Sequence, residues 1–96
     1  MAVAMEAQME NCAEEMMQTP NVIGVLCADS EALPLCYRGT LHSSAAAVVS
    51  QLLSLASTLD SESSLSPPVI TLQSAKSKLV ITKEGAVTVA VHKTLQ

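Results

Sequence analysis

The chain has 96 residues and a net charge of −4; 49% of its residues are hydrophobic and 15% are charged. This length fits one domain with a modest core, and the hydrophobic content is too high for a disordered chain. Arg38 is the single arginine and Tyr37 the single aromatic residue. Because phosphate recognition needs a basic stripe and base stacking needs aromatic rings, the composition excludes nucleic acid as a direct partner.

The cysteines predict free thiols in a reducing, cytosolic setting. Cys12, Cys27 and Cys36 are odd in number and show no C-x-x-C spacing, although Cys27 and Cys36 can face each other across a hairpin. The first residues lack the basic and apolar segments of a secretory signal. The apolar runs are too short to span a membrane and a myristoylation start is missing, so we expect no anchor of the chain's own.

From about residue 4 to residue 18 the spacing predicts a helix. Met5, Met9, Cys12 and Met16 recur on one side of it, and glutamates occupy a different side. Pro20 sets its end, because the residue before a proline resists the helical conformation. We expect the methionine stripe to pack on a sheet with the acidic face in water. The alternative is an adaptable methionine surface for partner proteins.

Residues 21–40 predict a hairpin whose first arm is an interior strand. The run from Val22 to Cys27 is apolar on both faces, with Val22, Gly24 and Leu26 expected on one face and Ile23, Val25 and Cys27 on the other. The cluster Asp29-Ser30-Glu31 turns the chain, and the second arm alternates apolar residues. Pro34 in that arm indicates an edge position or a bulge.

Residues 44–59 predict a second helix, which Ser43 or Ser44 can cap. Its apolar side chains fill an arc of roughly 160°, wider than one sheet face requires. They are Ala45, Val48, Val49, Leu52, Leu53, Leu55, Ala56 and Leu59. We therefore expect one flank of this helix to meet a second protein; the alternative is that the whole arc is core.

The rest of the chain predicts a loop over residues 60–68 and three strands over 69–93. Pro67 and Pro68 directly before the first of these strands favour a sheet edge, where missing N–H donors are tolerated. Gly85 fits a tight turn between the last two strands. The order α-β-β-α-β-β-β predicts a single α+β domain over residues 1–96. Its five-stranded sheet carries a helix on each face and its third strand lies beyond the centre.

The sequence offers little catalytic chemistry. Its three glycines are scattered, so neither a phosphate loop nor a dinucleotide fingerprint is present. A metal site from Asp29, Cys36 and His42 has no support in the spacing, and no cofactor is expected. Cys36 as a nucleophile with His42 as its base is the best enzyme hypothesis, but a small buried thiol is favoured over it. We expect Arg38 to form a salt bridge or a cap at the sheet edge.

Three stretches together point to a family. They are GVLCADSEALPLCYRGTL from Gly24 to Leu41, the serine-capped helix that follows, and EGAVTVAVHK from Glu84 to Lys93. The chain closely resembles the roadblock-domain subunits of Ragulator, the late endosomal/lysosomal adaptor and MAPK and mTOR activator complex. The resemblance implies a roadblock/longin-like fold whose five-stranded sheet is antiparallel. It also implies side-by-side pairing, in which the third strands and second helices form the contact and the two sheets become one continuous sheet. Carried onto this sequence, that interface comprises Leu52, Leu53, Leu55, Leu59, Val69, Ile70, Thr71, Leu72 and Gln73.

The resemblance also implies a function without catalysis. A scaffold subunit of this kind pairs with another roadblock subunit, and a lipidated subunit wraps the pairs and holds them on the cytosolic face of the late endosome or lysosome. The complex recruits Rag GTPases and acts on their nucleotide state, which brings mTOR complex 1 to the membrane when amino acids are available. A rival within the same fold is the dynein light-chain type of roadblock protein, a homodimeric cargo adaptor.

Overall fold

The structure, a computed structural model, describes residues 2–59 and 68–95, with side chains from residue 8 onward. Its elements are α1 Ala2–Met17, β1 Val22–Ala28, β2 Pro34–Gly39, α2 Ala45–Leu59, β3 Ile70–Gln73, β4 Ser77–Glu84 and β5 Val87–Thr94. This is the predicted order with small shifts at the boundaries, and the predicted loop over 60–68 lies almost wholly outside the described residues. Neither of these helices has the length and apolar character needed to cross a membrane.

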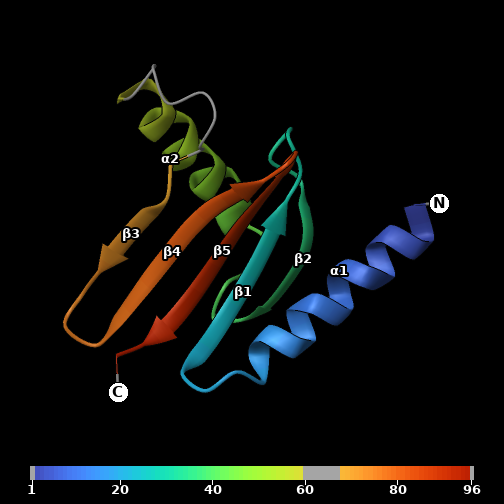
Figure 1. The fold of residues 1–96 in the computed structure, drawn as a ribbon, viewed down its shortest axis with the longest axis horizontal. Helices are drawn as coiled ribbons and strands as arrows, with labels where there is room; N and C mark the ends of the chain where they lie inside the picture. Colours follow the sequence, from blue (N-terminus) through green and yellow to red (C-terminus); the bar gives the residue numbers. More distant parts are fainter. Residues whose placement is uncertain (1, 60–67, 96) are drawn as a thin grey trace.

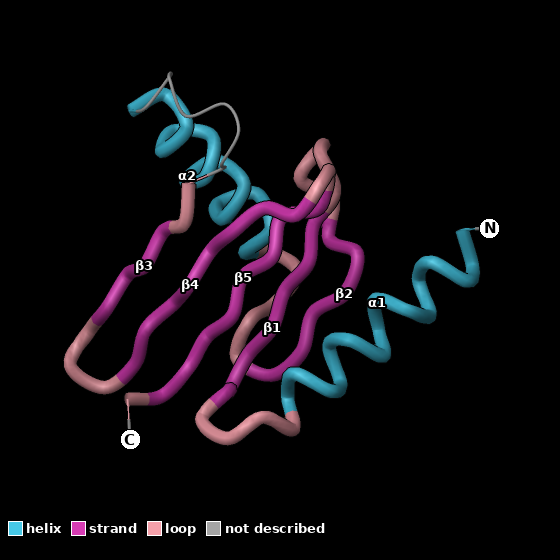
Figure 2. Tube along the Cα trace, in the orientation of Figure 1, coloured by secondary structure: helices cyan, strands magenta, loops and turns pink. Residues whose placement is uncertain are grey.

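The five strands form one antiparallel sheet in the order β2-β1-β5-β4-β3 (Figure 2). β1 pairs with β2 on one side and with β5 on the other, as its two apolar faces predict. β2 and β3 are the edges of the sheet, and β3 pairs with β4 alone among the described strands. The edge position of β2 agrees with Pro34, which lies opposite Ala28 beside a register shift.

The helices pack on opposite faces of the sheet, each over its own part of the core (Figure 1). On one face, Val49 and Leu53 of α2 pack against Leu26, Ile81 and Ala90. On the other face, Ala13 of α1 packs against Val25, Cys27 and Cys36. Small side chains at Ala46 and Ala90 allow α2 to approach the sheet closely, as the small residues of the last strand predict.

The face of α1 that packs on the sheet is rotated from the one predicted. Ala13 is fully buried, and Met9 and Met17 pack beside it, whereas Cys12 and Met16 are exposed. Spacing of four residues places Met9, Ala13 and Met17 on one side of a helix. The sequence prediction relied on the largest apolar side chains of the helix. The side chain most deeply buried against the sheet is instead the small one of Ala13.

The predicted faces of β1 are wrong at Val22, because the strand contains a bulge. The register with β5 shifts between Val22 and Gly24, so that Val22 pairs with Lys93 and Gly24 pairs with His92. Because a bulge inserts one extra residue, it reverses the alternation on its N-terminal side. Val22 therefore packs with Val25 on the α1 side instead of sharing a face with Gly24 and Leu26.

Candidate functional site

Large apolar side chains of α2 remain outside the core. Val48, Leu55 and Leu59 are 57%, 65% and 88% exposed, on the flank of the helix that faces away from the sheet. Leu72 within β3 and Val69 directly before it are also exposed. We call these five residues the α2–β3 surface. Exposed apolar groups of this size that gather on neighbouring elements are typical of protein–protein contacts.

The α2–β3 surface adjoins an open sheet edge. β3 pairs with β4 from Ile70 to Gln73, and its other side carries no strand among residues 2–59 and 68–95. Its outward N–H and C=O groups are therefore available to a strand of another chain. Ile70 packs on the core beneath α2, and Leu72, two residues on, lies on that same face. The edge strand and α2 are thus linked through the core beneath them, which Ile70 contacts.

Apart from Leu53, the residues predicted for pairing separate into three groups. Leu55, Leu59, Val69 and Leu72 are exposed on the α2–β3 surface. Leu52 and Ile70 are half-buried against the core, and Thr71 and Gln73 are exposed on the opposite face of the edge strand.

Leu53 requires a correction. It is 4% exposed and belongs to the core cluster, so it is not available to a partner. Val48 takes its place on the exposed flank: it lies within the predicted apolar arc but was not among the expected interface residues. The width of an apolar arc shows that a helix has two contacts, but only the position of the sheet shows which leucines serve each one.

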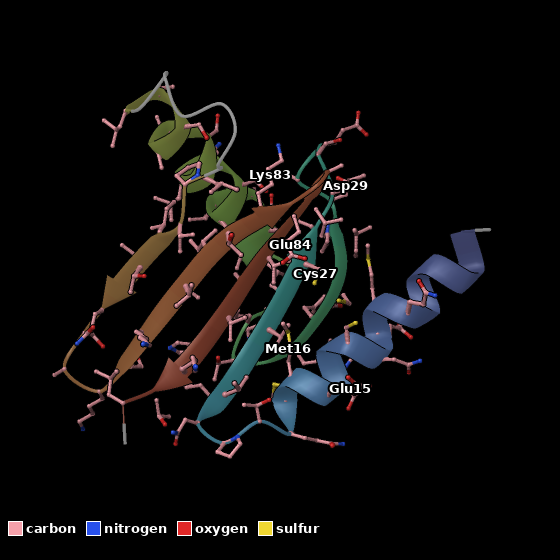
Figure 3. The ribbon with its side chains drawn as sticks, viewed as in Figure 1. Glu15, Met16, Cys27, Asp29, Lys83 and Glu84 are labelled. Atoms are coloured by element: carbon pink, nitrogen blue, oxygen red, sulfur yellow. The ribbon has the colours of Figure 1, made fainter. Side chains whose placement is uncertain are left out.

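A groove runs along the other face of the molecule, between α1 and β5. It has a volume of about 340 Å³. Figure 3 labels Met16, Cys27 and Glu84, which contribute to its lining from α1, β1 and β4. The remaining lining residues are Gln8, Met9, Cys12, Ala13, Val87 and Val89. We call this the α1–β5 groove, and its walls are chiefly apolar.

Cys27 lines this groove, and its thiol is held protonated by burial. Cys27 and Cys36 are directly opposed on β1 and β2, as the hairpin predicts, and both are free. Burial, with a smaller contribution from neighbouring Cys36, raises the pKa of Cys27 from 9.0 to about 12. Cys36 is also buried, and its Sγ donates to the carbonyl oxygen of Met9 at 3.7 Å. Buried thiols of this kind are inert, the opposite of an activated nucleophile.

Arg38 anchors α1 to the sheet edge. Its Nε donates to Glu14 Oε1 at 2.5 Å, and its Nη1 donates to the carbonyl oxygen of Tyr37 at 2.8 Å. The hydrogen bond to Glu14 is the largest cause of a raised pKa for the Arg38 guanidinium. This salt bridge confirms the structural role predicted for Arg38.

His92 links three strands on the α2 side of the sheet. Its Nδ1 lies 2.6 Å from Thr40 Oγ1, just beyond the end of β2, and its Nε2 lies 3.1 Å from Ser77 Oγ on β4. Gly24 leaves space for this link, because an added Cβ there would collide with Thr40 Oγ1. Both ring nitrogens are engaged by hydroxyl groups of the framework, so His92 ties the strands together and has a structural role.

A second cavity, of about 250 Å³, lies between α2 and the turn after β1. Its lining comprises Asp29, Ser30, Ser50, Leu53, Ser54, Ser57, Lys83 and Thr88. Asp29 Oδ1 already accepts the N–H groups of Glu31 and Leu33, so this carboxylate holds the turn. Among the side chains described, those of residues 8–59 and 68–95, no three His, Cys, Asp or Glu groups are placed to hold a metal ion, and this includes the set Asp29, Cys36 and His42.

The arrangement of sheet and helices is that of known folds. Myxococcus xanthus MglB superimposes with a TM-score of 0.81 at 16% identity, covering 94% of this chain and 72% of MglB. A Roadblock/LC7 domain from Streptomyces avermitilis gives a TM-score of 0.68 at 16% identity, covering 82% of this chain and 71% of that domain. The chain therefore has the roadblock/LC7 fold, as the sequence predicts.

Its sequence defines the family within that fold. Residues 5–93 match the family described as Ragulator complex protein LAMTOR5. The Xenopus tropicalis protein of that name is 40% identical over 89 residues, which cover 93% of this chain and 97% of the relative. A Nematostella vectensis homologue is 37% identical over 91 residues, with the same coverage of both chains. The chain belongs to the LAMTOR5 family.

Proposed function

We propose that this chain is a non-catalytic scaffold subunit of a Ragulator complex, and that it pairs with another roadblock subunit through the α2–β3 surface. The observation that carries the proposal is the exposed apolar flank of α2 together with the edge of β3, which pairs with no second strand among the described residues. The choice of Ragulator as the complex rests on the names of the matching family and of its relatives. The buried, protonated Cys27 and the framework role of His92 agree with a function that needs no reacting group.

Pairing at this surface would remove two unfavourable features of the isolated chain, the free edge of β3 and the exposed leucines of α2. An antiparallel partner strand on β3 would hydrogen-bond the free edge and join the two sheets. A facing helix would remove Leu55 and Leu59 from water. Full burial of a leucine contributes about 1.5–3 kcal/mol, from which the cost of association is subtracted. Two leucines with three further apolar contacts are therefore a reasonable centre for a stable interface.

The wider role follows from the proposed complex. A lipidated subunit wraps the roadblock pairs and holds them on the cytosolic face of the late endosome or lysosome. The assembly recruits Rag GTPases, acts on guanine nucleotide exchange, and so places mTOR complex 1 at that membrane during amino-acid signalling. In this arrangement the chain contributes surfaces, and it reaches the membrane only through its partners.

The experiment compares two neighbouring positions of α2. Leu55→Asp places a charge on the α2–β3 surface, whereas Ser54→Asp places the same charge on an exposed site one residue away, about 100° around the helix. Each variant is co-expressed with the other roadblock-domain Ragulator subunits, and the mass of the purified complex is measured by light scattering. We expect a one-to-one heterodimer for wild type and Ser54→Asp, and its loss for Leu55→Asp.

Circular dichroism on the same samples reports whether Leu55→Asp remains folded. Because Leu55 lies outside the core, its helix and sheet signals should stay those of wild type. Co-purification of Leu55→Asp at wild-type yield would show that the interface lies elsewhere. A stable homodimer that ignores the other subunits would instead favour the light-chain type of adaptor.

A further inference from the structure

The three cysteines of the chain gather on the α1 side of the sheet. Cys12 is exposed on α1, whereas Cys27 on β1 and Cys36 on β2 are buried. Cys12 and Cys27 both line the α1–β5 groove, and Cys27 packs with Cys36 in the core cluster beneath α1. The thiols therefore form a series from the surface to the interior, with Cys27 in the middle.

The backbone at Cys27 and Cys36 suits a disulfide. These two residues are directly opposed in the antiparallel pairing of β1 with β2, and both side chains lie on the α1 face. Opposed residues of antiparallel strands have Cα atoms about 4.5–5.5 Å apart, and a disulfide spans about 4.4–6.8 Å. The register shift directly after Cys27 interrupts the ladder beside the pair, which gives the strand room to adjust to a new bond.

Electrostatics also indicate that the three sulfur atoms are near one another. Burial is the largest cause of the raised pKa of Cys27, and Cys36 adds to it through its charge and a side-chain hydrogen bond. Cys12 makes a smaller contribution to the same pKa through its charge. Because charges shift a pKa mainly at short range, both thiols lie close to Cys27.

The thiols differ in how an oxidant reaches them. Oxidation by a hydroperoxide requires an accessible thiol, and buried thiols are protected from it. Cys12 is exposed and is therefore the point of entry, whereas Cys27 and Cys36 are shielded by the core. Once one sulfur atom is oxidised, attack by a neighbouring thiol passes the oxidation on to the next sulfur atom.

We propose that Cys12 passes oxidation by hydroperoxides inward, and that the product is a disulfide between Cys27 and Cys36. First, the Cys12 sulfur attacks the hydroperoxide; the O–O bond breaks, an S–O bond forms, and an alcohol, or water from hydrogen peroxide, leaves. Second, the Cys27 sulfur attacks the Cys12 sulfur, and the hydroxyl leaves as water with the Cys27 proton. Third, the Cys36 sulfur attacks Cys27, and Cys12 leaves as a thiol with the Cys36 proton.

The steps balance. Two thiols and one hydroperoxide give one disulfide, one alcohol and one water, so the two electrons lost by sulfur reduce the O–O bond. Cys12 is regenerated and acts only as a carrier. All three cysteines lie on the α1 side, away from α2 and the core beneath it, so the proposal stands independently of the pairing proposed above.

The test treats the full chain with hydrogen peroxide, blocks the remaining thiols with iodoacetamide and identifies cross-linked peptides by mass spectrometry without reduction. Digestion after glutamate separates the cysteines, because Glu14 and Glu15 lie between Cys12 and Cys27 and Glu31 lies between Cys27 and Cys36. We expect the peptides of Cys27 and Cys36 to be joined, the Cys12 peptide to be recovered alkylated, and dithiothreitol to separate the joined pair.

Three variants test the order of the steps. Cys12→Ser should slow formation of the Cys27–Cys36 bond by about tenfold or more, because the exposed thiol is lost. Cys36→Ala should halt the sequence at a bond between Cys12 and Cys27. Met16→Leu is the matched control: it removes another exposed sulfur atom from the same groove and should leave the rate unchanged.

Three results would overturn the proposal. One is the absence of a bond between Cys27 and Cys36 in the oxidised wild-type chain. Another is an undiminished rate in Cys12→Ser, whose substitution lies at the surface and leaves the core intact. The third is a Cys36→Ala chain in which Cys12 and Cys27 remain unlinked.

Discussion

Two glycines have nearly the same φ but different surroundings. Comparing alanine substitutions at them measures how much the close packing at the end of β2 adds to the free energy of unfolding. Gly39 has φ of 64° and Gly85 has φ of 60°, a region that costs an L-residue about 1–2 kcal/mol. A Cβ at Gly85 would meet no heavy atom within 4 Å. A Cβ at Gly39 would collide with the carbonyl oxygen of Ile23, which also accepts the N–H of Thr40 at 2.9 Å.

The expected costs follow from this difference. Gly85→Ala should lower the free energy of unfolding by about 1 kcal/mol, because the backbone cost is partly offset by a less flexible unfolded chain. Gly39→Ala adds a steric cost of about 1–3 kcal/mol and weakens the hydrogen bond between Ile23 and Thr40 by about 1 kcal/mol. With the same backbone cost, we therefore expect a total of about 3–5 kcal/mol for Gly39→Ala.

Urea and thermal unfolding of the full chain measure both variants on one scale. At about 4–8 °C per kcal/mol for a domain of this size, the midpoint of thermal unfolding should fall by about 5 °C for Gly85→Ala and by about 15–25 °C for Gly39→Ala. Equal destabilisation of the two variants would refute the reasoning, because it would mean that backbone angle alone decides the cost. It would also show that Gly39 makes no close contact that fixes the end of β2 against β1.

Three further predictions concern the first hairpin and the cysteine thiols. Ala32 has φ of 68°, so Ala32→Gly should raise the free energy of unfolding by about 0.5–1 kcal/mol, measured by urea unfolding; a loss of stability would contradict the assigned turn. Iodoacetamide should alkylate exposed Cys12 well before buried Cys27, as peptide mass spectrometry can show. Because burial raises the pKa of Cys27 from 9.0 to about 12, only the unfolded thiol ionises in that range, and stability should fall as pH rises through it. Cys27→Ala should make this fall shallower, and an unchanged slope would argue against the buried thiol.

The strand and helix pattern could be predicted because it depends on local chemistry. The apolar run of β1, the serine-flanked start of α2 and the turn at Gly85 each specify an element within a few residues. The edge positions also followed locally, since prolines at the start of β2 and before β3 lack the N–H that an interior strand needs. The thiols of Cys27 and Cys36 meet because hairpin register alone brings them together.

The sequence predicted the wrong buried faces for part of β1 and for α1, and in each case one residue is responsible. The bulge between Val22 and Gly24 moves Val22 to the α1 side of the sheet. The residues around it gave no local signal from which the bulge was predicted. On α1, the buried position went to Ala13 because a small side chain permits the closest helix–sheet contact, whereas hydrophobic size had favoured Met16.

The sequence by itself determined the α+β order, the interior strand and an α2 helix with more apolar surface than one sheet face can bury. Only the tertiary structure decided which side chains that surplus contains, placing Leu53 in the core and leaving Leu55 and Leu59 exposed. It also decided that α1 lies over β1 and β2, which places Cys12 at the groove that Cys27 lines. The reason is physical: periodicity fixes which residues share a face, but the number of strands that a helix covers depends on where it docks.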